Sequence, residues 1–183
     1  MRLAVILAVA FIATPALAQD MPSRKAGLWE MTMTSEGRGA PPQTMQQCID
    51  AATDKSMQDM SAGPRGQSCS KRETKNVGNT IVFDTVCSTG AGTTTSHGVV
   101  SGDFNSAYTV KINSKREGGA PNPNMPPETN MSVEAKWLGA CKADQKPGDI
   151  IMANGMKMNV IDMQRGGAGG MPPGAGGPPG MRK

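Results

Sequence analysis

Apolar and polar residues alternate in a series of short segments, and this alternation constrains the fold more than any other feature. Between Met131 and Trp137 every odd position is apolar, and a period of two residues is typical of a strand with one buried face. Alternation, or enrichment in β-branched residues between turn residues, predicts strands at 27–34, 43–48, 69–75, 80–87, 93–101, 104–113 and 131–137. Segment 69–75 is polar on both faces, so we expect it at a sheet edge. We therefore predict a mainly β fold, a twisted antiparallel meander or partly closed barrel with one short helix and two disulfides.

The one helix that the sequence predicts covers residues 50–60, with Asp50 or Thr53 as its N-cap. A Pro-Gly turn before Asp149 then leads the chain away from the last predicted strand. The methionines that follow suit a helix at one spacing and a strand at another. We predict a short helix or an irregular cover for this segment.

The first residues have the three regions of a secretory signal peptide. A basic Arg2 precedes an apolar run at 4–13, and small residues at Ala16 and Ala18 predict cleavage after Ala18. The apolar run is shorter than the roughly 20 residues that span a bilayer, so we expect an exported protein without a membrane-spanning segment. The domains expected are a signal peptide at 1–18, a single antiparallel β domain at 19–164 and a disordered Gly/Pro-rich tail at 165–183.

Four cysteines, Cys48, Cys69, Cys87 and Cys141, follow the predicted signal peptide. An even number in an exported chain predicts two disulfides, for which three pairings exist. A zinc site of four thiolates is the competing reading, but the sequence lacks the C-x-x-C pair typical of such sites. Cys87 and Cys141 share the parity of the apolar residues in their segments, whereas Cys48 and Cys69 flank the predicted helix in polar surroundings. We therefore predict Cys48–Cys69 and Cys87–Cys141.

Several short motifs occur in an order that resembles the bacterial domain-of-unknown-function family 3617. They are Gly27–Glu30, Cys48 before a short helix, and the run from Trp137 to Cys141 that leads into 146–149. The resemblance spans residues 22–163. It implies an exported protein of Gram-negative bacteria and hence a periplasmic location. It implies no activity, cofactor or catalytic residue.

Composition and motifs argue against two large functional classes. The net charge of +4 is scattered and only 3% of residues are aromatic, whereas nucleic-acid binding calls for a basic patch interleaved with aromatics. The single histidine, His97, lies on a predicted strand without a recognisable nucleophile motif around it. We expect a protein that is not an enzyme, with no catalytic residue, cofactor or metal site.

The classes that remain are a binding or structural module of the cell envelope, with a protein partner or a small apolar ligand. A curved sheet can hold an apolar ligand between its concave face and a covering helix, although the same apolar faces can pack a dry core. The 15 methionines suggest an alternative, since thioethers select Cu(I). Met31 with Met33 and Met156 with Met158 would be its ligands. Against this, methionine also fills gaps in cores, and copper carriers usually add histidine, of which the chain has only His97.

Overall fold

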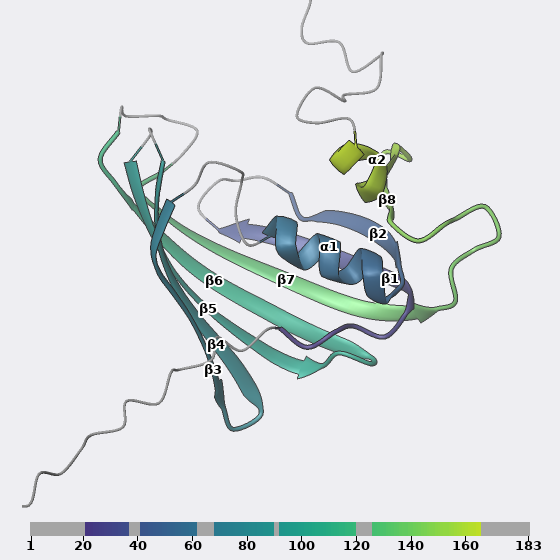
Figure 1. Cartoon of the computed structure of the whole chain (residues 1–183), viewed down its shortest axis with the longest axis horizontal. Coiled ribbons are helices and arrows are strands. Elements are labelled where there is room, and N and C mark those ends of the chain that lie inside the picture. The colour runs from purple at the N-terminus through teal and green to yellow at the C-terminus, as the bar shows by residue number, and fades with distance from the viewer. Residues whose placement is uncertain (1–20, 37–40, 62–67, 90–91, 120–125, 166–183) are drawn as a thin grey trace, which may run out of the picture.

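Nine strands of the described chain form one antiparallel sheet, in the order β3-β4-β5-β6-β7-β1-β2-β8-β9 (Figure 1). The computed structural model describes residues 21–36, 41–61, 68–89, 92–119 and 126–165. The strands are β1 (Gly27–Glu36), β2 (Gln43–Ile49), β3 (Ser68–Val77), β4 (Thr80–Thr89), β5 (Gly92–Asp103), β6 (Ala107–Glu117), β7 (Glu128–Gly139), β8 (Asp149–Met152) and β9 (Lys157–Asn159). The helices are α1 (Ala51–Ser61) and α2 (Val160–Arg165). The predicted signal peptide and all but the first residue of the predicted tail lie outside the described residues.

The predicted mainly β fold is confirmed, as an open sheet. Its meander is joined to the first strands of the chain by one long-range pairing, between β7 and β1. Strands β3 to β7 follow one another in the sheet as antiparallel neighbours. Strand β7 then pairs with β1, where Met31 lies opposite Ala135 and Met33 opposite Val133. No helix among the described residues has the length and apolar character needed to cross a membrane.

The alternation predicted from the sequence gives the sheet one apolar face, which packs against α1. The buried cluster on this face centres on Trp29, which is fully buried, with Tyr108 5.6 Å away between ring centroids. The other buried members are Ile49, Met57, Val100, Ala135 and Val160. In Figure 1, α1 lies in front of β1 and β7. This side of the sheet is called the core-facing side below.

Two segments differ from their predicted structure. The strand predicted at 104–113 begins later, at Ala107, because the Asp103 carboxylate accepts hydrogen bonds from Asn105 N and Ser106 Oγ, both at 2.9 Å, and holds a turn. The segment after Asp149, predicted as a helix or irregular cover, forms β8 and β9 before the short α2. Strand β2 offers a free edge there, and β8 completes its backbone hydrogen bonds.

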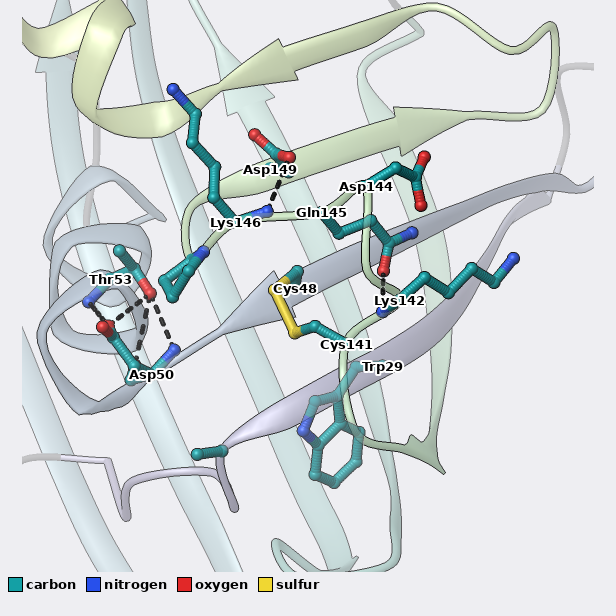
Figure 2. The surroundings of a disulfide bond; sticks show 12 residues. Trp29, Cys48, Asp50, Thr53, Cys141, Lys142, Asp144, Gln145, Lys146 and Asp149 are labelled. Carbon is teal, nitrogen blue, oxygen red and sulfur yellow. Dashed lines mark hydrogen bonds between the residues drawn. A yellow bond between two sulfur atoms is a disulfide. The ribbon is translucent and has the colours of Figure 1, made fainter.

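The predicted disulfide pairing is wrong: the bonds are Cys48–Cys141 and Cys69–Cys87. Cys87 cannot reach Cys141, because β5 and β6 separate β4 from β7 and adjacent strands are about 4.8 Å apart. Cys69 instead lies directly opposite Cys87, with 3.9 Å between Cα atoms. Gly139, with φ 125°, ends β7, so the alternation of that strand does not extend to Cys141. The chain turns there and brings Cys141 to β2 (Figure 2).

Candidate functional site

Helix α1 begins directly after β2 and is held at its N-terminus by reciprocal hydrogen bonds. Asp50 Oδ1 accepts a bond from the Thr53 backbone N–H at 2.8 Å, and Thr53 Oγ1 accepts one from the Asp50 backbone N–H at 2.9 Å (Figure 2). The bond from the Thr53 N–H lowers the pKa of Asp50. The two predicted capping residues therefore act together, and they fix where the helix starts to cover the sheet.

A buried ion pair ties the first described residues to α1. Arg24 Nε donates to Asp54 Oδ1 at 2.7 Å, and the Arg24 backbone N–H donates to Asp54 Oδ2 at 2.8 Å. The Arg24 Nη1 atom donates to Gln47 Oε1 at 3.0 Å. The Asp54 side chain is fully buried and that of Arg24 is 7% exposed. A charge pair with this many internal partners holds structure together, and we do not assign it a binding role.

The same guanidinium occupies the space between two thioethers. Its Nη1 atom lies 3.6 Å from Met31 Sδ and its Nη2 atom 3.6 Å from Met57 Sδ. A permanent positive charge at this distance disfavours a cuprous ion at Met31. Met156, of the second predicted pair, is 40% exposed and precedes β9. Among the described residues, no group of three or more His, Cys, Asp or Glu is arranged to hold a metal ion.

His97 lies on the side of the sheet opposite α1. Its Nδ1 atom is 2.9 Å from Asp84 Oδ1, and its side chain is 55% exposed. This hydrogen bond lowers the pKa of Asp84. The neighbouring hydroxyl, Ser96 Oγ, is 2.8 Å from Ser114 Oγ on the core-facing side, so strand alternation keeps it away from His97. The Asp84–His97 pair and the Ser96 hydroxyl therefore lie on opposite sides of the sheet and do not form one site.

The carboxylate of Asp149 faces a hollow of about 470 Å³ between the Pro-Gly turn and β9. Burial raises the pKa of this carboxyl, but hydrogen bonds from Asn159, the Lys146 N–H and Lys157 outweigh burial, and the pKa is lowered. Asn159 Nδ2 and Lys157 Nζ both lie 2.9 Å from the carboxylate. With three donors to its buried carboxylate, Asp149 holds the Pro-Gly turn in place against β9. Figure 2 shows one of these bonds, from Lys146.

Helix α1 covers only part of the core-facing side. It has 11 residues and is therefore about 16 Å long, whereas the 12 residues of β7 extend about 40 Å. On the helix stripe that faces the sheet, Thr53 and Met57 are buried, but Met60, three residues later, is 42% exposed. Among the described residues, the apolar face of the sheet therefore continues past the end of α1.

Four side chains form what we name the open face: Met33, Phe83, Ile112 and Met131. All are half-buried. Met131 lies opposite Ile112, Ile112 opposite Gly98, and Gly98 opposite Phe83, so three of them lie in one row across four strands. Phe83 packs against the buried cluster, whereas Met33, Ile112 and Met131 are not among the described residues that do so.

Glycine at position 98 determines the shape of this row. A Cβ atom on Gly98 would lie 2.0 Å from the Phe83 ring, so the ring occupies the space over the glycine. The row therefore presents an aromatic surface flanked by Ile112. A shallow apolar platform of this kind suits contact with a flexible hydrocarbon.

Beyond the open face the core-facing side becomes polar and then basic. The next row across the sheet consists of Arg72, Thr85, Ser96, Ser114 and Thr129. The row after it holds the Cys69–Cys87 disulfide, Thr94 and Arg116. Arg72 Nη2 lies 3.0 Å from Cys69 Sγ, which places the guanidinium at this end of the sheet.

Sequence reasoning missed the arginines of both regions. Arg116 has the parity of Ile112 and Ser114 on the same strand, so its face could have been read from alternation. Arg72 could not, because β3 contains a bulge between Cys69 and Lys71 that shifts its parity. Arg24 lies before the first strand, where no periodicity indicates burial.

A comparison with family models identifies residues 24–141 as matching a family described as a protein of unknown function, DUF3617. The match takes in β1 to β7 and both disulfides, and it ends before the Pro-Gly turn and β8. It is shorter than the span of resemblance expected from the sequence. No curated protein and no solved structure matches the chain.

Proposed function

The chain belongs to the DUF3617 family, and from its geometry we propose that it is an exported binding module that holds a small apolar ligand on the open face. The observation that carries this proposal is the continuation of the apolar rows past the end of α1. Large contiguous apolar patches on a protein surface mark binding sites, and three half-buried apolar side chains of the open face lie in one row across β4 to β7. No catalytic step forms part of the proposal.

Export is supported by the two disulfides. Both are formed and no described cysteine is free, which indicates an oxidising compartment outside the cytosol. We propose that the compartment is the periplasm and that residues 1–18 direct the chain to it. The intact mass of the protein purified from its native envelope tests this: a mature chain beginning at Gln19 supports it, and a chain that retains Met1 contradicts it.

Binding is tested with N-phenyl-1-naphthylamine, a neutral dye whose fluorescence rises in apolar surroundings. We expect saturable enhancement with the oxidised protein, and its loss in Ile112→Gln, which places an amide on the open face. The matched control is Leu138→Gln. Leu138 is 43% exposed on the opposite side of the sheet, so this variant should bind the dye as the parent does.

Two outcomes contradict the proposal. The first is a parent protein that gives no saturable enhancement, and the second is an equal loss in both variants. Mass spectrometry of organic extracts from natively purified protein supplies an independent measurement. A reproducible hydrophobic molecule supports the carrier function, whereas an empty extract together with absent dye binding leaves the apolar rows as packing surface alone.

A further inference from the structure

We propose that the open face takes a long-chain carboxylate, with its hydrocarbon on the apolar rows and its carboxylate at Arg116. This inference rests on the proposed function and adds the class of ligand and its orientation. It follows from the order of side chains along one strand and from the distribution of charge between the two sides of the sheet.

Strand β6 carries the full sequence of polarity on its core-facing side. Tyr108 is buried, Val110 and Ile112 are half-buried, and Ser114 and Arg116 follow on the same face. At about 3.4 Å per residue, the distance along the strand from Val110 to Arg116 is about 20 Å. An extended hydrocarbon chain with one charged end fits such a path. A compact apolar ligand would contact only Val110 and Ile112 and would make no contact with Ser114 or Arg116.

The hydroxyl row lies between the apolar and the basic parts. Ser96 Oγ and Ser114 Oγ are 2.8 Å apart, and Thr85 and Thr129 continue the row on both sides. Hydroxyls can donate to an anion and can also accept from a guanidinium. This row is therefore suited to the region where a ligand changes from hydrocarbon to carboxylate.

The carboxylates of β1 to β7 are confined to one side of the sheet. On β1 to β7, the strand register places every carboxylate and every lysine on the side opposite α1, and it leaves Arg72 and Arg116 as the charged residues of the core-facing side. The carboxylates are Glu30, Glu36, Glu73, Asp84, Asp103, Glu117, Glu128 and Glu134. A ligand on the open face therefore meets no carboxylate from these strands and lies on the same side as two arginines, which favours an anion over a neutral or cationic head group.

Arginine also suits the carboxylate chemically. Its planar guanidinium presents five donors in a geometry that matches the two oxygens of a carboxylate. Arg116 lies on the same strand as the apolar path, whereas Arg72 is three strands away on β3. We therefore assign the direct contact to Arg116 and a weaker, longer-range attraction to Arg72.

The test compares two amphiphiles of equal chain length and opposite charge, laurate and dodecyltrimethylammonium, each below its micelle concentration. Affinity is measured on the full mature protein by calorimetry and by displacement of N-phenyl-1-naphthylamine. We expect laurate to bind at least tenfold more tightly than the cation. Arg116→Gln should lower laurate affinity about tenfold, as expected for the loss of a charged hydrogen bond, and Arg72→Gln should lower it less.

The strand supplies a matched control for each variant. Lys115→Gln and Lys71→Gln remove the same charge from the neighbouring residue, on the other side of the sheet. Laurate affinity should stay at the parent value in both. Dye affinity should also stay unchanged in Arg116→Gln, which shows that the apolar rows are intact.

The outcomes separate this inference from the function on which it rests. Dye binding with equal affinity for the two amphiphiles, or an equal effect of Arg116→Gln and Lys115→Gln, overturns the carboxylate assignment and leaves the apolar site standing. Absence of both dye and laurate binding overturns the proposed function as well. Binding of the protein to anionic vesicles without uptake of monomeric laurate also overturns the assignment, since it would indicate a membrane surface as the target.

Discussion

The two ends of the core-facing side are built from the same strands by the same alternation, yet they differ in cover. At the covered end, Trp29 and Asp54 are fully buried and every polar group described above has a partner. At the open end, Ile112 and Met131 are half-buried and lead to hydroxyls and arginines. Alternation therefore creates an apolar face without deciding whether it becomes core or surface.

The length of α1 decides that difference. A helix rises 1.5 Å per residue and a strand about 3.4 Å, so an 11-residue helix cannot cover strands of 10 to 12 residues. The Arg24–Asp54 pair and the N-cap hold the helix at one end of the sheet rather than at its middle. That α1 leaves these rows free of its own cover is a consequence of where the helix is anchored.

The largest effect should come from the disulfide at the covered end. Replacing Cys48 and Cys141 with alanine opens a loop of 93 residues and should lower the free energy of unfolding by about 4–5 kcal/mol. Replacing Cys69 and Cys87 opens a loop of 18 residues and should cost about 3 kcal/mol. Urea unfolding of the two double variants measures both values. A larger loss from the Cys69–Cys87 pair would mean that the open end contributes more to stability than its exposure suggests.

Removing the helix anchor should have the next largest effect. Arg24→Ala leaves the buried Asp54 carboxylate without its cation, which should cost about 3–5 kcal/mol. The control is Lys55→Ala, which breaks an exposed Lys55–Asp59 pair with side chains more than 60% exposed and should cost less than about 0.5 kcal/mol. Similar unfolding midpoints in urea for both variants would show that the buried pair does not anchor α1.

The secondary structure of this sheet could be predicted from the sequence because alternation is a local property. The segments around Ile81, Val133 and Gln46 form strands as expected, 69–75 lies at an edge, and the helix starts next to Asp50. The prediction for residues 149–159 was wrong, because these residues form strands by pairing with the free edge of β2 and not because of their own sequence pattern.

Strand order and the candidate site could not be predicted, because both depend on which segments are neighbours. Parity correctly placed Cys87 on the apolar face, but only the order of the strands shows that Cys69 is its partner. The row from Met131 to Phe83 likewise exists only once β4 to β7 are aligned in register. The local sequence determines which side of the sheet a residue faces, whereas the strands that lie next to it are determined by the order of the whole sheet.

A matched pair of isoleucines compares the two ends directly. Ile49 is 2% exposed within the buried cluster, so Ile49→Ala should leave a cavity and cost about 2–5 kcal/mol. Ile112 is half-buried on the open face, where no closed cavity forms, and Ile112→Ala should cost about 1 kcal/mol. Urea unfolding without ligand measures both. Equal losses would show that the open end is packed as tightly as the covered end, and the binding proposal would lose its basis.

The smallest effect concerns the helix start and depends on pH. The pKa of Asp50 is lowered in the folded protein, first by the Thr53 N–H, so its contribution is fully present above its unfolded pKa of about 3.9 and is lost as pH falls through the folded value. Asp50→Ala should therefore cost about 1 kcal/mol at pH 7, and this difference should shrink below about pH 4. Asp50→Asn keeps the accepting oxygen without the charge, so its cost at pH 7 should be smaller than that of Asp50→Ala. Both costs should fall by the same amount at low pH, because only the parent protein titrates at this position. Urea unfolding of both variants between about pH 2.5 and 7, a range that includes the titration of an Asp carboxyl, measures these costs. A pH-independent cost for Asp50→Ala would show that the carboxylate charge does not hold the start of α1.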